Sequence, residues 1–239
     1  MVNRSDMVDP PYQDYVSGGF AYSFCQAYNA KSLNGRKPET WADFWDVSKF
    51  PGKRAWPKFY LGTAEPPLMA DRVAKDKMYP LDLDRAFAKM SELRRNMLFY
   101  ESYAQAEQML ESGAVELALI PNGRVYDLQQ RGAPIEMIWN DAVLLPWEGP
   151  VVPKGAPHAD AMFALMSVMA DPRNQAKMAK ATGYAPTVSK AYDFIDDATA
   201  ENLANSPEHK RNALTVDAAA LARQNAAYSA GYTKWLGKA

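Results

Sequence analysis

Residues 115–132 constrain the fold most, because they predict a strand, a tight turn and a helix in immediate succession. The run begins with six mostly apolar residues, a length typical of a strand, and Pro-Asn-Gly at 121–123 is a turn signal. The helix predicted after the turn ends at Gly132, a residue type common at helix ends. In open α/β sheets, the N–H groups at such a junction point toward bound ligands. Taken alone, this stretch is equally well explained as an ordinary connecting loop.

Strand and helix patterns alternate along residues 31–142, and several helix starts carry local signals. Thr40 with Asp43 and Ser102 with Gln105 are capping-box pairs, in which a hydroxyl residue precedes an acid or amide by three positions. Asp82 is a third expected cap. Short loops between alternating elements predict a mostly parallel sheet with helices on its faces.

Residues 143–153, VLLPWEGPVVP, interrupt this alternation. Their pattern is strand-like, but two prolines break it, and proline is excluded from a central strand except at bulges or ends. We therefore expect a bent crossing segment here. Trp147 and Glu148 lie between the prolines, either as ligand contacts or as a bend packed by its tryptophan.

The remaining segments are a lead-in over residues 1–14, a buried strand within residues 16–30, and a mostly helical C-terminal third. A methionine-rich stripe over residues 159–170 is typical of a helix face packed in a core. The last helix is expected over residues 215–236. The side chains expected to be buried on these two helices are Met162, Leu165, Met166, Met169, Leu221, Tyr228, Tyr232 and Trp235.

Composition excludes several classes of function. The chain has 239 residues, enough for one large or two small domains, and its net charge of -1 argues against a nucleic-acid-binding surface. Cys25 is the single cysteine, so an intrachain disulfide and a thiolate cluster are both excluded. His158 and His209 are far apart and lack metal-ligand spacing, so no metal site and no cofactor are expected. The N-terminus lacks the apolar core of a signal peptide.

No catalytic motif is present: the sequence has no P-loop, no G-x-G-x-x-G before a helix, no H-E-x-x-H and no G-x-S-x-G. Glu65 and Glu148 form one candidate acid/base pair for a hydrolase. Acids flanked by aromatic residues also bind cations through charge and cation–π attraction. Glu65 has a third, structural explanation, because a carboxylate in the first turn of a helix is favoured by the helix dipole. We expect a protein that is not an enzyme.

Residues 38–56, PETWADFWDVSKFPGKRAW, resemble the periplasmic solute-binding proteins of polyamine-type ABC transporters. Supporting stretches occur in the family's order, at residues 122–124 (NGR), 131–135 (RGAPI), 183–187 (GYAPT) and around Gln224 and Asn225. The resemblance covers nearly the whole chain.

The resemblance implies an α/β, type II periplasmic-binding-protein fold with two lobes joined by crossing strands and a ligand in the cleft. Residues 1–30 would be the lead-in and first crossing strand, 31–142 the second lobe, 143–153 the return crossing strand, and 154–239 the C-terminal part of the first lobe. The family's N-terminal portion has no counterpart here, so the first lobe would be incomplete. Helices such as the one over residues 159–170 would then expose apolar surface and favour self-association.

The resemblance also implies a set of ligand-binding residues. Glu65 and Glu148 would hold ammonium groups, with Trp147 and Tyr184 as aromatic walls. The other implied contacts are Gln224 and Asn122. At Pro121, the position before Asn122, the family often has a tryptophan. Loss of that aromatic wall weakens the polyamine assignment, and Arg124 suits a carboxylate, so a ligand that carries both charges competes with putrescine or spermidine.

The expected function is that of the substrate-binding component of an ABC transporter for a small cationic amine such as putrescine or spermidine. A zwitterionic amino acid such as 4-aminobutyrate is the alternative ligand. The expected location is the periplasm, the expected partner is a membrane permease, and no bond chemistry is involved. Two alternatives from other classes are a hydrolase that uses the Glu65/Glu148 pair and a ligand-sensing effector module.

Overall fold

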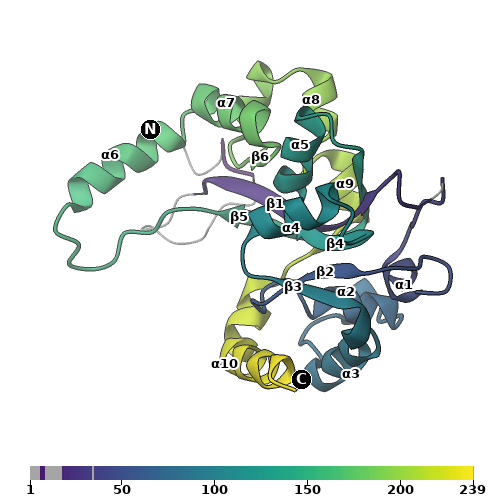
Figure 1. Cartoon of the computed structure of the whole chain (residues 1–239). Helices are drawn as coiled ribbons and strands as arrows, with labels where there is room; N and C mark the ends of the chain where they lie inside the picture. Colours follow the sequence, from purple (N-terminus) through teal and green to yellow (C-terminus); the bar gives the residue numbers. More distant parts are fainter. Residues whose placement is uncertain (1–5, 9–17, 34, 239) are drawn as a thin grey trace. The chain divides into compact units, whose positions relative to one another are not determined.

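The computed structural model describes residues 6–8, 18–33 and 35–238 (Figure 1). The lead-in expected over residues 1–14 lies outside the described residues except for positions 6–8. Within the described part of the chain, no helix combines the length and the apolar character needed to cross a membrane.

The chain divides into two compact units, and each is built from two separate stretches of sequence. Unit 1 comprises Met1–Ser23 and Leu144–Arg211, and unit 2 comprises Phe24–Val143 and Asn212–Ala239. The expected division assigned residues 154–239 as a whole to the first lobe. The last part of that range belongs instead to unit 2, because its side chains pack and form hydrogen bonds there.

Unit 2 is built around a mixed β-sheet. Unit 2 contains β2 (Arg54–Pro57), β3 (Met97–Tyr100), β4 (Leu117–Pro121), β7 (Leu214–Thr215) and the larger part of β1 (Phe20–Asn29) and of β5 (Ile135–Glu148). Their order is β3-β2-β4-β1-β5-β7. β2 pairs in parallel with β3 and β4, whereas β1 runs antiparallel to β4. The parallel pairing expected from the alternating segment over residues 31–142 is confirmed for β2, β3 and β4, whereas β1, which precedes that segment, makes the sheet a mixed one.

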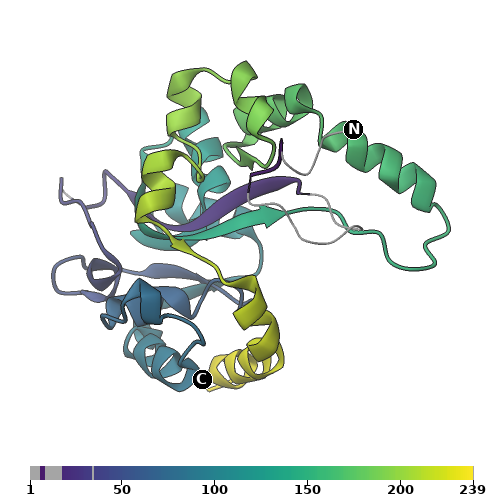
Figure 2. The ribbon, with the colours of Figure 1, turned by 180° about the vertical axis from the view of Figure 1, so that it is seen from behind.

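The helices of unit 2 are α1 (Trp41–Trp45), α2 (Glu65–Ala70), α3 (Leu83–Glu92), α4 (Tyr103–Glu111), α5 (Asn122–Gln130) and α10 (Ala218–Leu236), with short 3₁₀ turns η2 (Lys75–Lys77) and η3 (Arg94–Asn96). α4 and α5 cover one face of the sheet, where Leu110 and Leu128 pack with Ile120 of β4. α10, although last in the sequence, lies beside α3 in both views (Figures 1 and 2).

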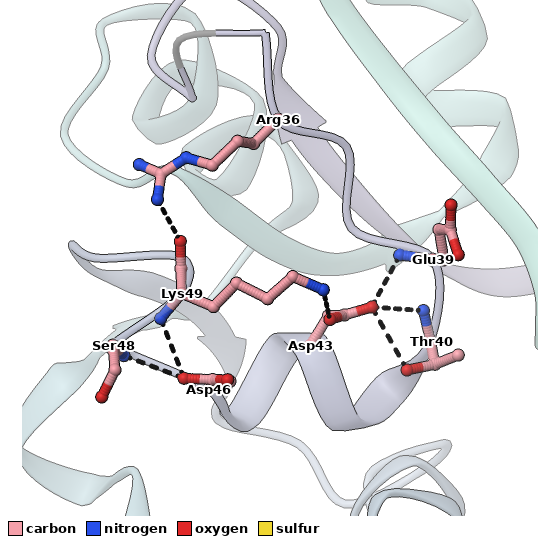
Figure 3. Close-up of polar contacts among 7 residues, drawn as sticks. All are labelled: Arg36, Glu39, Thr40, Asp43, Asp46, Ser48 and Lys49. Carbon is pink, nitrogen blue, oxygen red and sulfur yellow. Dashed lines mark hydrogen bonds and ion pairs between the residues drawn. The ribbon is translucent and has the colours of Figure 1, made fainter.

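The predicted helix caps are confirmed. At α1, the Asp43 carboxylate accepts hydrogen bonds from the backbone N–H groups of Thr40 (3.1 Å) and Glu39 (2.9 Å), and it also binds the Lys49 ammonium at 2.8 Å (Figure 3). Desolvation opposes ionisation of Asp43, but these hydrogen bonds outweigh it and lower its pKa. Ser102 accepts a hydrogen bond from the Gln105 N–H group as the α4 cap. The spacing of neighbouring residues was sufficient to predict these caps, because a cap forms between residues only a few positions apart.

Arg54 is the buried centre of the segment over residues 38–56. Its side chain has no exposed surface, and it donates to the backbone carbonyls of Phe44 (2.9 Å), Gly52 (3.0 Å) and Phe50 (2.6 Å). Desolvation lowers the Arg54 pKa to about 10, so the guanidinium stays charged at neutral pH. One planar side chain therefore ties the end of α1 and the following loop to β2.

Two boundaries around the sheet differ from expectation. The Pro-Asn-Gly turn expected at residues 121–123 does not form, because β4 includes Pro121 and α5 begins at once with Asn122. The break expected at residue 143 is also absent, because β5 continues through Pro146 to Glu148. A proline is tolerated in a strand where its position donates no ladder hydrogen bond. The irregularity lies earlier, at Asp141, whose φ is +58° and whose carbonyl accepts a hydrogen bond from the Trp41 indole at 2.8 Å.

Unit 1 contains the start of β1, the end of β5, and α6 (Ala159–Met169), α7 (Pro172–Thr182), β6 (Ala185–Pro186), the 3₁₀ segment η4 (Ser189–Phe194), α8 (Asp197–Glu201) and most of α9 (Pro207–Asn212). α7 has Asp171 as its cap and ends at Gly183, whose backbone is left-handed. The segment after Gly183 forms β6, which pairs antiparallel with β1. Gln175, which is buried, links α7 to this pair by donating to the Gly19 carbonyl and accepting from the Thr187 N–H group.

The methionine-rich face of α6 is not the expected core face. Met166 is buried, but Leu165 is 49% exposed and Met169 is 37% exposed. Phe163 and Val168 of the same helix are also exposed. The prediction of burial was wrong for most of this helix because spacing identifies an apolar face but does not supply an element to cover it. Self-association through this surface stays a prediction.

Candidate functional site

The expected site residues fall in both units. Glu65, Asn122, Arg124 and Gln224 belong to unit 2, and Trp147, Glu148 and Tyr184 belong to unit 1. Each group is described within its own unit.

Glu65 is the most constrained of these residues. It is the first residue of α2, with Ala64 as the preceding cap and Pro66 and Pro67 in the first turn, and its exposed fraction is 0%. The Tyr79 hydroxyl donates a hydrogen bond to Glu65 Oε1 at 3.1 Å. Glu65 Oε2 has no hydrogen-bond partner in the part of the chain that the structure describes.

The electrostatic setting of Glu65 disfavours its charged form. Burial raises the pKa of the carboxyl, and the nearby polar groups, which are the backbone N–H groups of Glu65 and Ala64 and the Tyr79 hydroxyl, lower it only in part. No cation is paired with Glu65 among the described residues. A buried carboxylate with one free oxygen is strongly attractive to a ligand cation, because an unpaired buried charge is costly.

Tyr228 of α10 binds the backbone of the two residues that precede Glu65 in the sequence, Thr63 and Ala64. Its buried hydroxyl accepts hydrogen bonds from the N–H groups of Thr63 (3.0 Å) and Ala64 (2.7 Å) and lies 3.0 Å from Thr63 Oγ1. Burial, and then the charge of Glu65, raise the pKa of this hydroxyl well above its ordinary value. The sequence predicted Tyr228 as a core residue, and a buried tyrosine hydroxyl needs a partner. The residue type therefore predicted a hydrogen-bond partner for Tyr228, but not that this partner lies about 165 positions earlier in the chain.

Gln224 lies one helical turn before Tyr228, and both of its amide atoms are occupied. The Leu81 N–H group donates to Gln224 Oε1 at 2.8 Å, and Gln224 Nε2 donates to the Leu81 carbonyl at 3.0 Å. This side chain therefore joins α10 to the segment before α3. The ligand contact expected for Gln224 stays a prediction, but its observed contacts are structural.

Replacing Gln224 by Leu is expected to lower the free energy of unfolding by about 1–3 kcal/mol, because two backbone groups of Leu81 lose their partners. The affinity of the protein for its ligand is expected to change less than about threefold. This corresponds to a change in binding free energy well below about 1.4 kcal/mol, the value for a tenfold change. Urea unfolding and calorimetric titration measure the two quantities. Substitution by Glu, which keeps the acceptor and loses the donor, should give an intermediate stability. A large affinity loss with unchanged stability would show instead that Gln224 contacts the ligand.

Asn122 and Arg124 lie in the first turn of α5. Asn122 is 1% exposed, whereas Arg124 is on the surface. The Arg124 guanidinium lies 3.6 Å from Glu107 Oε1 and 5.5 Å from the centre of the Tyr103 ring. Arg124 is thus already paired with an acid and an aromatic ring, and binding of a ligand carboxylate would compete with that pair.

Of the expected site residues in unit 1, Tyr184 belongs to an aromatic cluster with Phe20 and Tyr22. The Tyr184 ring stacks on Phe20, with ring centres 4.9 Å apart and planes at 13°, and it meets Tyr22 edge-on at 5.8 Å. Trp147 is half-buried and Glu148 is exposed at the end of β5. The Glu148 carbonyl accepts a hydrogen bond from Gly19 at 2.7 Å, so its backbone is held by β1.

Comparison with known proteins gives the context of these residues. The profile of a family described as bacterial extracellular solute-binding protein matches residues 10–210. The gamma-aminobutyric acid-binding protein of Pseudomonas aeruginosa is 31% identical over 204 residues, which are 83% of this chain and 57% of that protein. The match thus spans little more than half of this relative.

Solved structures superpose on the chain over nearly its full length. A GABA receptor has a TM-score of 0.91 at 31% identity and covers 100% of this chain and 73% of its own. The periplasmic binding protein MotA from A. tumefaciens B6, in complex with glucopine, has a TM-score of 0.90 at 32% identity. The superposition covers 98% of this chain and 75% of MotA. The fold is therefore the expected α/β periplasmic-binding-protein fold. These proteins are binding proteins, which agrees with the expectation that the chain is not an enzyme.

The polyamine part of the expected resemblance is not supported. A putative spermidine/putrescine ABC transporter from Listeria monocytogenes has a TM-score of 0.80 at only 17% identity, so this likeness shows the fold alone. The relatives at about 30% identity include a GABA-binding protein, a GABA receptor and the MotA protein in complex with glucopine. Since the matching profile covers most of its length, the chain belongs to the bacterial extracellular solute-binding protein family.

Proposed function

We propose that the protein is the substrate-binding component of an ABC transporter and that its ligand is a small zwitterionic amine of the 4-aminobutyrate type. It would work in the periplasm and deliver this ligand to a membrane permease without bond chemistry. The observation that carries the proposal is the buried Glu65 carboxylate, whose Oε2 has no partner within the described residues. The GABA-binding relatives support the same class of ligand.

An ammonium group fits this position for a physical reason. It is a compact cation with three donors, so it neutralises the carboxylate and supplies the hydrogen bond that Oε2 lacks. Tyr79 and Tyr228 keep the carboxylate and its backbone in place before the ligand arrives, which limits the entropy lost on binding. Ligand roles for Asn122, Arg124, Trp147, Glu148 and Tyr184 stay predictions.

Calorimetric titration of the protein with 4-aminobutyrate, putrescine and spermidine tests the proposal. We expect 4-aminobutyrate to bind most tightly, since the two polyamines carry cations at each end and lack a carboxylate. Tighter binding of putrescine or spermidine would restore the polyamine interpretation. If none of the three binds, the amine assignment falls and Glu65 is a structural acid.

The affinity for 4-aminobutyrate is expected to depend on pH through Glu65. The carboxyl has a raised pKa in the ligand-free protein, so it is protonated on the acid side of that pKa and cannot pair with the ammonium group. Affinity should therefore rise by about tenfold per pH unit up to the raised pKa and be constant above it. Titrations in buffers of different ionisation enthalpy should also detect proton release on the acid side. Affinity that does not change with pH would contradict an ionic role for Glu65.

A further inference from the structure

Gln26 of β1 is a buried amide without a hydrogen-bond partner. It is 2% exposed, and neither Oε1 nor Nε2 has a partner in the described part of the chain. Buried polar side chains are almost always paired, so an exception of this kind needs an explanation. Asn29 on the same strand shows the usual situation: its Nδ2 donates to the Leu110 carbonyl and its Oδ1 accepts from the Lys31 N–H group.

Strand geometry places Gln26 on the face of the sheet opposite the α4 and α5 layer. Ala27 packs in the core cluster with Ala118 and Ile120, beneath those helices. Side chains of neighbouring residues in a strand point to opposite faces. Gln26, which lies opposite Leu119 in the antiparallel pair with β4, therefore points to the other face.

The same face carries the segment that leads to Glu65. Phe24 shares the face of Gln26, because the two residues are two positions apart. Phe24 packs so closely on Gly62 that a Cβ atom at Gly62 would lie 2.4 Å from the Phe24 ring, and Gly62 has a φ of +74°. Thr63, Ala64 and Glu65 follow directly. The loop that leads to Glu65 thus packs, at Gly62, on the face of β1 that carries Gln26.

We propose that Gln26 contacts the ligand and selects a zwitterion over a diamine; this inference rests on the proposed function. The amide offers one acceptor, Oε1, and one donor group, Nε2. An ammonium group can satisfy only Oε1, whereas a ligand that also carries a carboxylate satisfies both atoms. A diamine such as putrescine has no acceptor, so it leaves Nε2 buried and unpaired, and a site of this kind discriminates strongly against such a ligand.

Gln26→Leu and Gln26→Glu variants, titrated with 4-aminobutyrate and putrescine, test this inference. We expect Gln26→Leu to weaken 4-aminobutyrate binding by about 10- to 100-fold, with the melting temperature of the ligand-free protein unchanged or higher. Gln26→Glu replaces the donor by a second acceptor and a negative charge. The ratio of putrescine affinity to 4-aminobutyrate affinity should therefore rise by at least about tenfold.

Asn29→Leu is the matched control, because it removes a buried amide whose partners are both backbone groups. It is expected to lower the melting temperature and to change 4-aminobutyrate affinity less than about threefold. If Gln26→Leu binds like the wild type, or if Gln26→Glu leaves the affinity ratio unchanged, the role of Gln26 is overturned while the proposed function stands. If the wild-type protein binds neither ligand, the proposed function falls and this inference falls with it.

Discussion

Replacing Glu65 by Gln is expected to weaken 4-aminobutyrate binding by roughly 30- to 1,000-fold, because one partner of a buried ion pair is removed. The same change should stabilise the ligand-free protein. The wild-type carboxylate is buried with Oε2 unpartnered within the described residues, and neutralising it removes that penalty. We expect a gain of about 1 kcal/mol, or about 2–4 °C in melting temperature for a chain of this size. Calorimetric titration and thermal unfolding measure the two effects.

The stabilisation should depend on pH with a defined sign. The folded-state pKa of Glu65 is raised, so the folded protein holds this proton more tightly than the unfolded chain does. The wild-type protein therefore loses stability relative to Glu65→Gln as pH rises from about 4.3, the ordinary glutamate value, to the raised pKa. The difference is constant above that pKa and vanishes at lower pH.

Glu92→Gln is a suitable control for this prediction. Glu92 lies at the exposed end of α3 and pairs with Lys89, and an exposed ion pair contributes little to stability. Its loss should leave the ligand affinity unchanged. A Glu65→Gln variant that binds as tightly as the wild type would remove Glu65 from the site.

Replacing Arg54 by Met is expected to lower the free energy of unfolding by about 3–5 kcal/mol. Two buried carbonyls and one partly buried carbonyl lose a charged donor at once, and each such hydrogen bond contributes about 1.5–3 kcal/mol before the structure relaxes. Arg54→Lys should recover only a small part, because an ammonium group cannot reproduce a planar fork of donors. Urea denaturation of the ligand-free protein gives the values.

Arg95→Met, at an exposed position of η3, is the control for Arg54. It should change the free energy of unfolding by less than about 0.5 kcal/mol. Because Arg54 stays charged at neutral pH, its contribution should be constant across the neutral range. A loss of stability below about 1 kcal/mol for Arg54→Met would mean that the loop between α1 and β2 is held by other contacts.

Features that depend on neighbouring residues could be predicted from the sequence. The caps at Thr40, Ser102 and Asp171 and the left-handed end at Gly183 follow from residue type and spacing over a few positions. The segment over residues 38–56 identified the family, and Arg54 gives a physical reason for its pattern, since the carbonyls it binds lie within ten positions.

Features that depend on distant residues could not be predicted. Glu65 was identified at a strand-to-helix junction, but its environment is made by Tyr79 and Tyr228, which are remote in sequence. Gln26 was missed for a similar reason, since only the folded strand shows that its amide is buried and unpartnered within the described residues. The sequence also did not indicate that the Gln224 amide joins two segments separated by 143 positions.

The split composition of unit 2 has a consequence for synthesis on the ribosome. The chain emerges from its N-terminus, so Phe24–Val143 is available long before Asn212–Ala239. Until the last segment appears, the N–H groups of Thr63 and Ala64 lack the Tyr228 hydroxyl and Leu81 lacks the Gln224 amide. The nascent unit would therefore hold a partly assembled core until Asn212–Ala239 has been synthesised.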